Sequence, residues 1–182
     1  MTAYAIALFF HFVGMVGLFV GYGLEWTGSS LLRKAKTSDD ARSALGLYRL
    51  SLPISGPGLL LLIITGGYLA AVTGGMRQGW ISGALLGIVF ALGIGFVFIL
   101  PRVRTIRAAI PQGSAPLAPT ALARANDPMI VTLIRVRFML ALGIVALMTS
   151  KPQLLSTALF VLLGSIVIGM LAAIGAWAKT KN

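Results

Sequence analysis

Two ionisable residues stand in the first hydrophobic stretch of the chain, and they are its only histidine, His11, and its only glutamate, Glu25. A histidine inside a membrane helix can ligate haem or a metal or carry a proton, and a buried glutamate can pair with a cation or take up a proton. On a helix, their separation of 14 residues corresponds to roughly 21 Å along the axis and to nearly the same direction around it. The two side chains therefore cannot touch, but they face the same neighbouring helices at different depths.

Small residues lie between these two side chains on the same helical face. The residues on this face are His11, Gly14, Leu18, Gly21 and Glu25. The glycines predict a groove for a lipid tail, a quinone or a haem, so His11, Gly14 and Gly21 are candidate cofactor-binding residues, with haem as the candidate cofactor. The alternative is a neutral His11 bonded to a backbone carbonyl or to Ser/Thr of another helix. One histidine cannot supply two imidazole ligands from a single chain.

Glu25 lies at the other end of the stretch, beside a strongly basic segment. We expect it to pair with an arginine such as Arg49 or Arg102. Arg135 and Arg137 are expected to bind lipid phosphate or to pair with Glu25. A catalytic or proton-conducting carboxylate, and an arginine clamp for an anionic substrate, are the alternatives.

The composition places these residues in a membrane. The chain has 182 residues, of which 58% are hydrophobic and 10% are charged, against about 25% charged in soluble domains. The absence of cysteine excludes disulfides and thiolate chemistry, and the sequence contains no P-loop, zinc-protease or dinucleotide-binding motif. We therefore predict an all-α bundle forming a single integral-membrane domain over residues 1–182, and assign no catalytic or metal-binding residue. The net charge of +11 indicates anionic lipid as partner and not nucleic acid.

Five stretches are long and apolar enough to cross about 30 Å of hydrocarbon. They cover residues 4–26, 54–73, 80–100, 130–150 and 154–177. Thr37 followed by two aspartates predicts a helix start, with a short surface helix over 41–50. Asn126-Asp127-Pro128 predicts the start of the fourth spanning helix. Gly83 and Gly87 predict a close helix contact in the third.

Prolines and arginines predict interruptions in this pattern. Pro53 and Pro57 predict an irregular or kinked entry to the second span, and Pro101 predicts the end of the third. Arg135 and Arg137 follow the fourth helix start closely, so we expect both side chains to reach back to water.

The basic residues predict the orientation. With the N-terminus outside, 13 of the 15 bases fall on the inner side, and only Arg77 and Lys151 fall outside. The positive-inside rule therefore predicts an outer N-terminus, an inner C-terminus and an odd number of spans.

Short motifs add a resemblance. They are His11 to Gly14 (HFVG), Thr65-Gly66-Gly67, Leu100 to Arg102 (LPR) and Leu147 to Pro152 (LMTSKP). Over about residues 5–152 this pattern resembles a bacterial integral-membrane family catalogued as a domain of unknown function, and more distantly the copper-resistance D and HemJ-type membrane proteins. The resemblance implies a bacterial cytoplasmic (inner) membrane as the location. The more distant resemblance implies a haem or redox role for His11.

Three classes of function remain open on the sequence. The first is a non-catalytic structural, assembly or accessory membrane protein, with a homo-oligomer or a membrane complex as its setting. The second is a haem-binding or redox protein that uses His11. The third is a small transporter.

Overall fold

The computed structural model describes residues 2–73, 78–113 and 115–178, with only the backbone described for 176–178. Arg77, Lys179 and Lys181, which enter the charge count, lie outside these ranges. Within them the chain is helical, apart from connecting segments and one isolated bridge, and no strand forms. Five of its helical stretches are long and apolar enough to cross a membrane.

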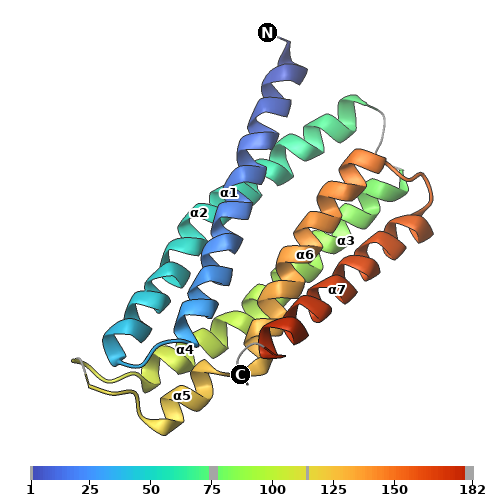
Figure 1. The fold of residues 1–182 in the computed structure, drawn as a ribbon. Coiled ribbons are helices and arrows are strands. Elements are labelled where there is room, and N and C mark those ends of the chain that lie inside the picture. The colour runs from blue at the N-terminus through green and yellow to red at the C-terminus, as the bar shows by residue number, and fades with distance from the viewer. Residues whose placement is uncertain (1, 74–77, 114, 179–182) are drawn as a thin grey trace.

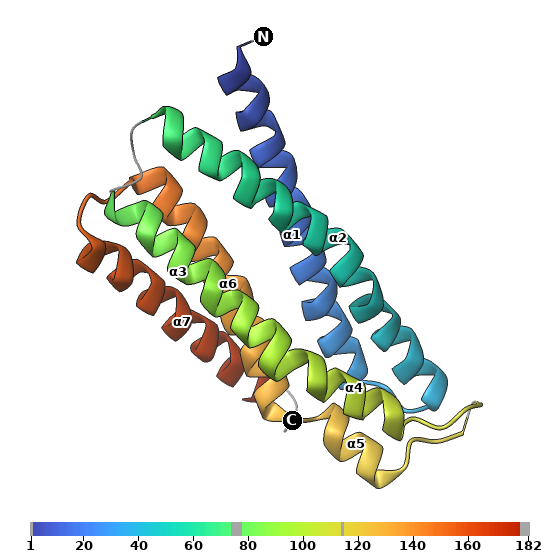
Figure 2. The same cartoon turned by 180° about the vertical axis from the view of Figure 1, so that it is seen from behind.

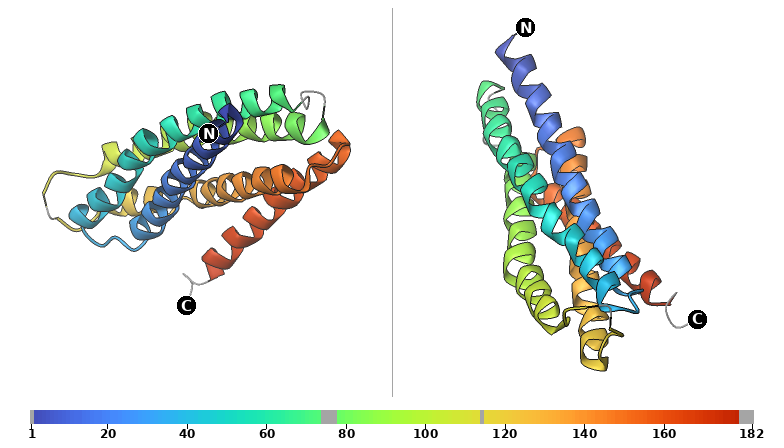
Figure 3. Two further views of the ribbon diagram at one scale, coloured as in Figure 1. Left: turned by 90° about the horizontal axis from the view of Figure 1, so that it is seen from above. Right: turned by 90° about the vertical axis from the view of Figure 1, so that its left-hand side faces the viewer.

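The helices form two groups that meet at one end of the bundle. Helix α1 (Ala3–Leu32) packs along α2 (Ser38–Val72), and α3 (Gly79–Gly93) packs with α6 (Pro128–Ser150) and α7 (Leu155–Ala178). Figures 1 and 2 show the groups diverging towards the N-terminus and converging where α4 (Leu100–Ala109) and α5 (Pro119–Ala125) lie. Figure 3 shows the same helices from above and from the side. The start of α1 and the end of α7 lie at opposite ends of the bundle (Figure 1).

Small residues bring α1 and α2 into backbone contact. A Cβ built on Gly14 would lie 2.7 Å from the carbonyl oxygen of Gly58, and one on Gly21 would lie 2.5 Å from the Cβ of Ser55. Neither position has room for a side chain, so the glycines are required for this close approach. The face predicted from the sequence is thus the face that packs against α2. The predicted contact at Gly83 and Gly87 is confirmed, because added Cβ atoms there would meet Ala158 of α7 and Ile144 of α6.

The two prolines of the second stretch do not divide it. A single helix runs from Ser38 to Val72 with Pro53 and Pro57 inside it, so the predicted separate surface helix, with a non-helical entry to the second span, was wrong. Each proline removes one N–H donor, but Ser55 and Gly58 press against α1 around them. This packing holds the helix together. The predicted start is confirmed, because Thr37 caps the helix in a capping box with Asp40.

Pro101 does not end the third spanning helix either. Helix α3 continues through a π-helical segment, η1 (Ile94–Ile99), into α4, which ends at Ala109. The N–H of Leu100 reaches back to the carbonyl of Gly95, which is the wider π-type spacing. Pro101 then occupies the first turn of α4, where proline is tolerated. The predicted start of the fourth spanning helix is confirmed, because the Asp127 side chain accepts a bond of 2.9 Å from the N–H of Met129.

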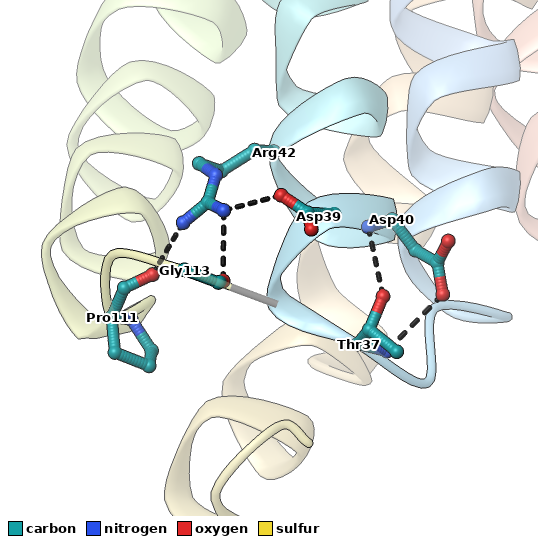
Figure 4. Close-up of polar contacts among 6 residues, drawn as sticks. All are labelled: Thr37, Asp39, Asp40, Arg42, Pro111 and Gly113. Atoms are coloured by element: carbon teal, nitrogen blue, oxygen red, sulfur yellow. Dashed lines mark hydrogen bonds and ion pairs between the residues drawn. The ribbon is translucent and has the colours of Figure 1, made fainter. Parts of the chain in front are cut away.

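The convergent end of the bundle has its own apolar core and a set of polar contacts around Arg42. Leu32, Ile106 and Ile130, from α1, α4 and α6, are almost fully buried there. Figure 4 shows Arg42 of α2 donating to the carbonyls of Pro111 (2.5 Å) and Gly113 (2.8 Å) while it pairs with Asp39. The α4–α5 connection is therefore fastened to the start of α2.

Candidate functional site

A buried ion pair joins the first and the fourth spanning helices near the convergent end. Nη1 of Arg137 on α6 donates to both carboxylate oxygens of Glu25 on α1, at 2.8 and 3.0 Å. Each side chain is 10% exposed. Removing two charges from water is costly, and their attraction repays that cost only when the remaining polar atoms are also satisfied.

Neighbouring residues complete the surroundings of the pair. The hydroxyl of Ser51 lies 3.1 Å from Oε1 of Glu25 and 3.0 Å from the carbonyl oxygen of Tyr48, so its single proton can serve one acceptor at a time. The guanidinium of Arg137 stands 4.2 Å from the ring centroid of Tyr22, a distance at which a cation–π attraction is effective.

Gly95 makes room for the arginine. A Cβ at this position would lie 2.8 Å from Cζ of Arg137, so a larger residue would displace the guanidinium. Gly95 belongs to the π-helical segment, and such segments occur often at functional sites. Together, α1, α2, η1 and α6 each contribute a residue in contact with the ion pair.

Two of the other predicted partners of Glu25, Arg102 and Arg135, have partners elsewhere. Arg49 borders the same cavity as Glu25 without an ion pair to it. Arg102 pairs with Asp127 at 3.5 Å. Arg135 donates to the carbonyl of Ala172 on α7 (2.9 Å) and stacks 4.5 Å from the ring centroid of Trp26. Arg137 does not reach back to water, because its side chain is 10% exposed, and the expected pairing with Glu25 is confirmed for it. Arg135 is half-buried.

A cavity of about 320 Å³ extends from the ion pair towards the basic end of the bundle. Its inner end is formed by Glu25, Arg137 and Ser51. Arg49, Arg104 and Arg107 lie along the remainder. Apolar side chains form much of the wall; they are Leu52, Phe96, Ile99, Leu100 and Val103.

His11 lies elsewhere, at the interface of α1 and α2. Its Nδ1 lies 3.1 Å from Oγ1 of Thr65, and that hydroxyl donates to the carbonyl of Leu61 at 2.5 Å. With the hydroxyl proton used in this way, the contact fits the tautomer of His11 that carries its proton on Nδ1. A neutral histidine bonded to Ser/Thr of another helix matches this geometry. The added Cβ of Gly66 would lie 3.1 Å from Cε1 of His11, so the HFVG and Thr65-Gly66-Gly67 motifs meet here.

The groove expected beside Gly14 and Gly21 is filled by α2, as the close contacts with Gly58 and Ser55 show. Among the residues that the structure describes, no cluster of three or more His, Cys, Asp or Glu side chains could hold a metal ion. The polar groups around His11 hold two helices together.

Sequence reasoning missed three residues of the ion-pair site. Tyr22 and Ser51 are adjacent to predicted span ends, where polar and aromatic residues are common, so their types carried no special signal. Gly95 is one of 22 glycines in the chain, and only the approach of Arg137 distinguishes it.

Comparison with protein-family models, with curated proteins and with solved structures found no match for this chain. The function therefore has to be inferred from the geometry.

Proposed function

We propose that this is a small multi-pass protein of the bacterial cytoplasmic membrane, with its N-terminus outside and its C-terminus in the cytoplasm, that has a structural, assembly or accessory role and no catalytic one. Its basic end faces the cytoplasmic leaflet and binds anionic lipid. Five helices of spanning length and composition support the multi-pass assignment.

The observation that carries the proposal is the one-ended distribution of positive charge. The segment joining α1 to α2 holds Arg33, Lys34 and Lys36, and α4 and α5 hold four further arginines. These segments lie together at the convergent end (Figure 1). Of the bases in the described ranges, only Lys151 lies at the opposite end. Such an asymmetry favours the cytoplasmic side and attraction to anionic headgroups.

The buried polar groups connect helices to one another, and this supports an accessory role. Glu25 and Arg137 join α1 to α6, and His11 joins α1 to α2. Both sets are bonded within the bundle, where they stabilise one arrangement of the helices. Kinship with the bacterial integral-membrane family that the sequence resembles is part of the proposal. Its support is that the resembling motifs contact each other at His11 and Thr65.

Reporter fusions test the orientation. A fluorescent reporter active only in the cytoplasm should be bright when fused after Asn182, and a periplasm-dependent phosphatase should be active when inserted at Gly75. A dark C-terminal fusion together with an inactive phosphatase at Gly75 contradicts the proposal.

A further inference from the structure

The cavity beside the ion pair changes in polarity along its length. On the third spanning helix it is bordered in turn by Phe96, Leu100 and Arg104, and finally by Arg107, about 16 Å further along the axis at 1.5 Å per residue. On α2, Arg49 borders the same basic part and Leu52 the apolar part. Leu52 and Phe96 are 53% and 54% exposed, on faces that a membrane would cover. The cavity therefore joins lipid-facing surface to a basic headgroup region.

The charge of the cavity is not balanced by the protein. Its single acid, Glu25, is already paired with Arg137. The other acids are used elsewhere: Asp39 pairs with Arg42, Asp127 pairs with Arg102, and Asp40 caps α2. Among the described residues, no carboxylate lies within ion-pair distance of the three remaining cavity arginines, which are Arg49, Arg104 and Arg107. The cavity thus carries an excess of three positive charges.

Polar atoms at the inner part of the cavity also lack partners. Tyr48 is only 8% exposed, and its hydroxyl lies near Ser29 without reaching hydrogen-bonding geometry with any described residue. The Nε of Arg137 is also buried and has no hydrogen-bond partner among the described residues. A buried polar atom without a partner is costly and uncommon, so each is a donor available to a bound ligand.

We propose that this cavity binds the phosphate headgroup of one anionic amphiphile, whose apolar tail leaves past Leu52 and Phe96 into the bilayer. Guanidinium groups bind phosphate oxygens through paired, charge-assisted hydrogen bonds, and three of them suit a phosphate better than a single carboxylate. The volume of about 320 Å³ suits a headgroup, at the lower end of the range of about 300–1,000 Å³ found for ligand pockets. The inference rests on the proposed function in one respect: the orientation proposed above makes the cytoplasmic leaflet the source of the ligand.

Lipid retention measured by native mass spectrometry tests the inference. The full chain is reconstituted in phosphatidylcholine nanodiscs containing a minor fraction of phosphatidylglycerol, then released and washed in neutral detergent. We expect one phosphatidylglycerol to remain on each wild-type chain. Because the double variant Arg104→Gln/Arg107→Gln loses two charge-assisted contacts, its apparent affinity should fall about tenfold or more.

A matched variant separates this site from general attraction to the basic end. Lys34→Gln/Lys36→Gln removes the same charge from the same end of the bundle, but neither lysine borders the cavity. We expect it to retain the lipid as the wild type does. All four substituted side chains are exposed, so both variants should fold, and equal melting temperatures without lipid would verify this.

A second variant and a competitor test the apolar part. Leu100→Trp narrows the apolar part of the cavity and should weaken retention of phosphatidylglycerol. Glycerol 3-phosphate has no apolar tail, so at millimolar concentration it should not displace the lipid. Equal loss of lipid in the two charge variants would overturn the cavity site while leaving the orientation proposal intact. Full displacement by glycerol 3-phosphate would contradict the claim that the ligand is held by its apolar tail as well as by its phosphate. An inverted reporter pattern, in contrast, contradicts the proposed function without altering lipid retention.

Discussion

Breaking the Glu25–Arg137 pair should cost far more stability than the loss of an ordinary polar contact. Glu25→Leu leaves a guanidinium that is 10% exposed without its counter-charge, and removing one partner of a buried ion pair costs about 3–5 kcal/mol. For a chain of this size, each kcal/mol corresponds to about 2–4 °C in melting temperature, so the expected loss is roughly 6–20 °C. Arg137→Leu should have a similar effect and also loses the stacking on Tyr22.

The double variant distinguishes a coupled pair from two independent packing sites. With both charges replaced by leucine, no uncompensated charge remains, and such replacements are often neutral or stabilising. Glu25→Leu/Arg137→Leu should therefore be more stable than either single variant, with a coupling energy of up to about 3 kcal/mol. Thermal unfolding of purified protein in a mild detergent, followed by a fluorescent dye or by circular dichroism, measures all four members of the cycle.

The more exposed pair Arg102–Asp127 is the control. Its side chains are 31% and 32% exposed and 3.5 Å apart, so Arg102→Leu should cost less than about 1 kcal/mol. Additive single losses in the Glu25–Arg137 cycle, or a loss at Glu25 no larger than that at Arg102, would refute the reasoning.

Three further predictions use pairs of variants or a spectrum. Gly21→Ala should destabilise the protein by about 1–3 kcal/mol through overpacking against α2, whereas Gly23→Ala, with nothing within 4 Å of its added Cβ, should be neutral or stabilising; equal melting temperatures would argue against the glycine contact. Gly95→Ala should lower the melting temperature by displacing the guanidinium, while Gly93→Ala, also in open space, should not; a Gly95→Ala protein as stable as the wild type would contradict the fit. His11→Ala should cost about 1 kcal/mol through the lost hydrogen bond, and the wild type should show no Soret band after purification or after adding haemin; a band that this variant abolishes would instead establish the haem reading.

The positions of the long helices could be predicted from the sequence because length and hydropathy determine which segments can cross a bilayer. Local cap signals were equally informative: Thr37 and Asp127 cap the helices that their neighbours predicted. At Pro53 and Pro101 the predicted helix ends were wrong, because a local pattern contains the cost of placing proline in a helix but not the packing that offsets this cost. Packing against α1 and the π-helical turn before Pro101 accommodate them, and neither is visible in a local pattern.

The sequence could name Arg137 only as one of several possible partners of Glu25, for a different reason. Helical periodicity gives the direction in which a side chain points along its own helix, but not which helix lies opposite. Arg137 is 112 residues away, and its contact with Glu25 depends on α1 packing against α6. The space at Gly95 depends on a third helix as well. The sequence could therefore nominate both charged residues without showing that they form a pair.

Single-cysteine labelling tests the orientation of the bundle most directly, because the chain has no cysteine of its own. Lys34→Cys lies in the basic segment, and Gln153→Cys lies in the connection between α6 and α7 at the other end. In intact cells with a permeable outer membrane, a membrane-impermeant maleimide should label Gln153→Cys and should reach Lys34→Cys only after the inner membrane is opened. Labelling of Lys34→Cys in intact cells, with Gln153→Cys protected, would place the basic end outside and contradict the account.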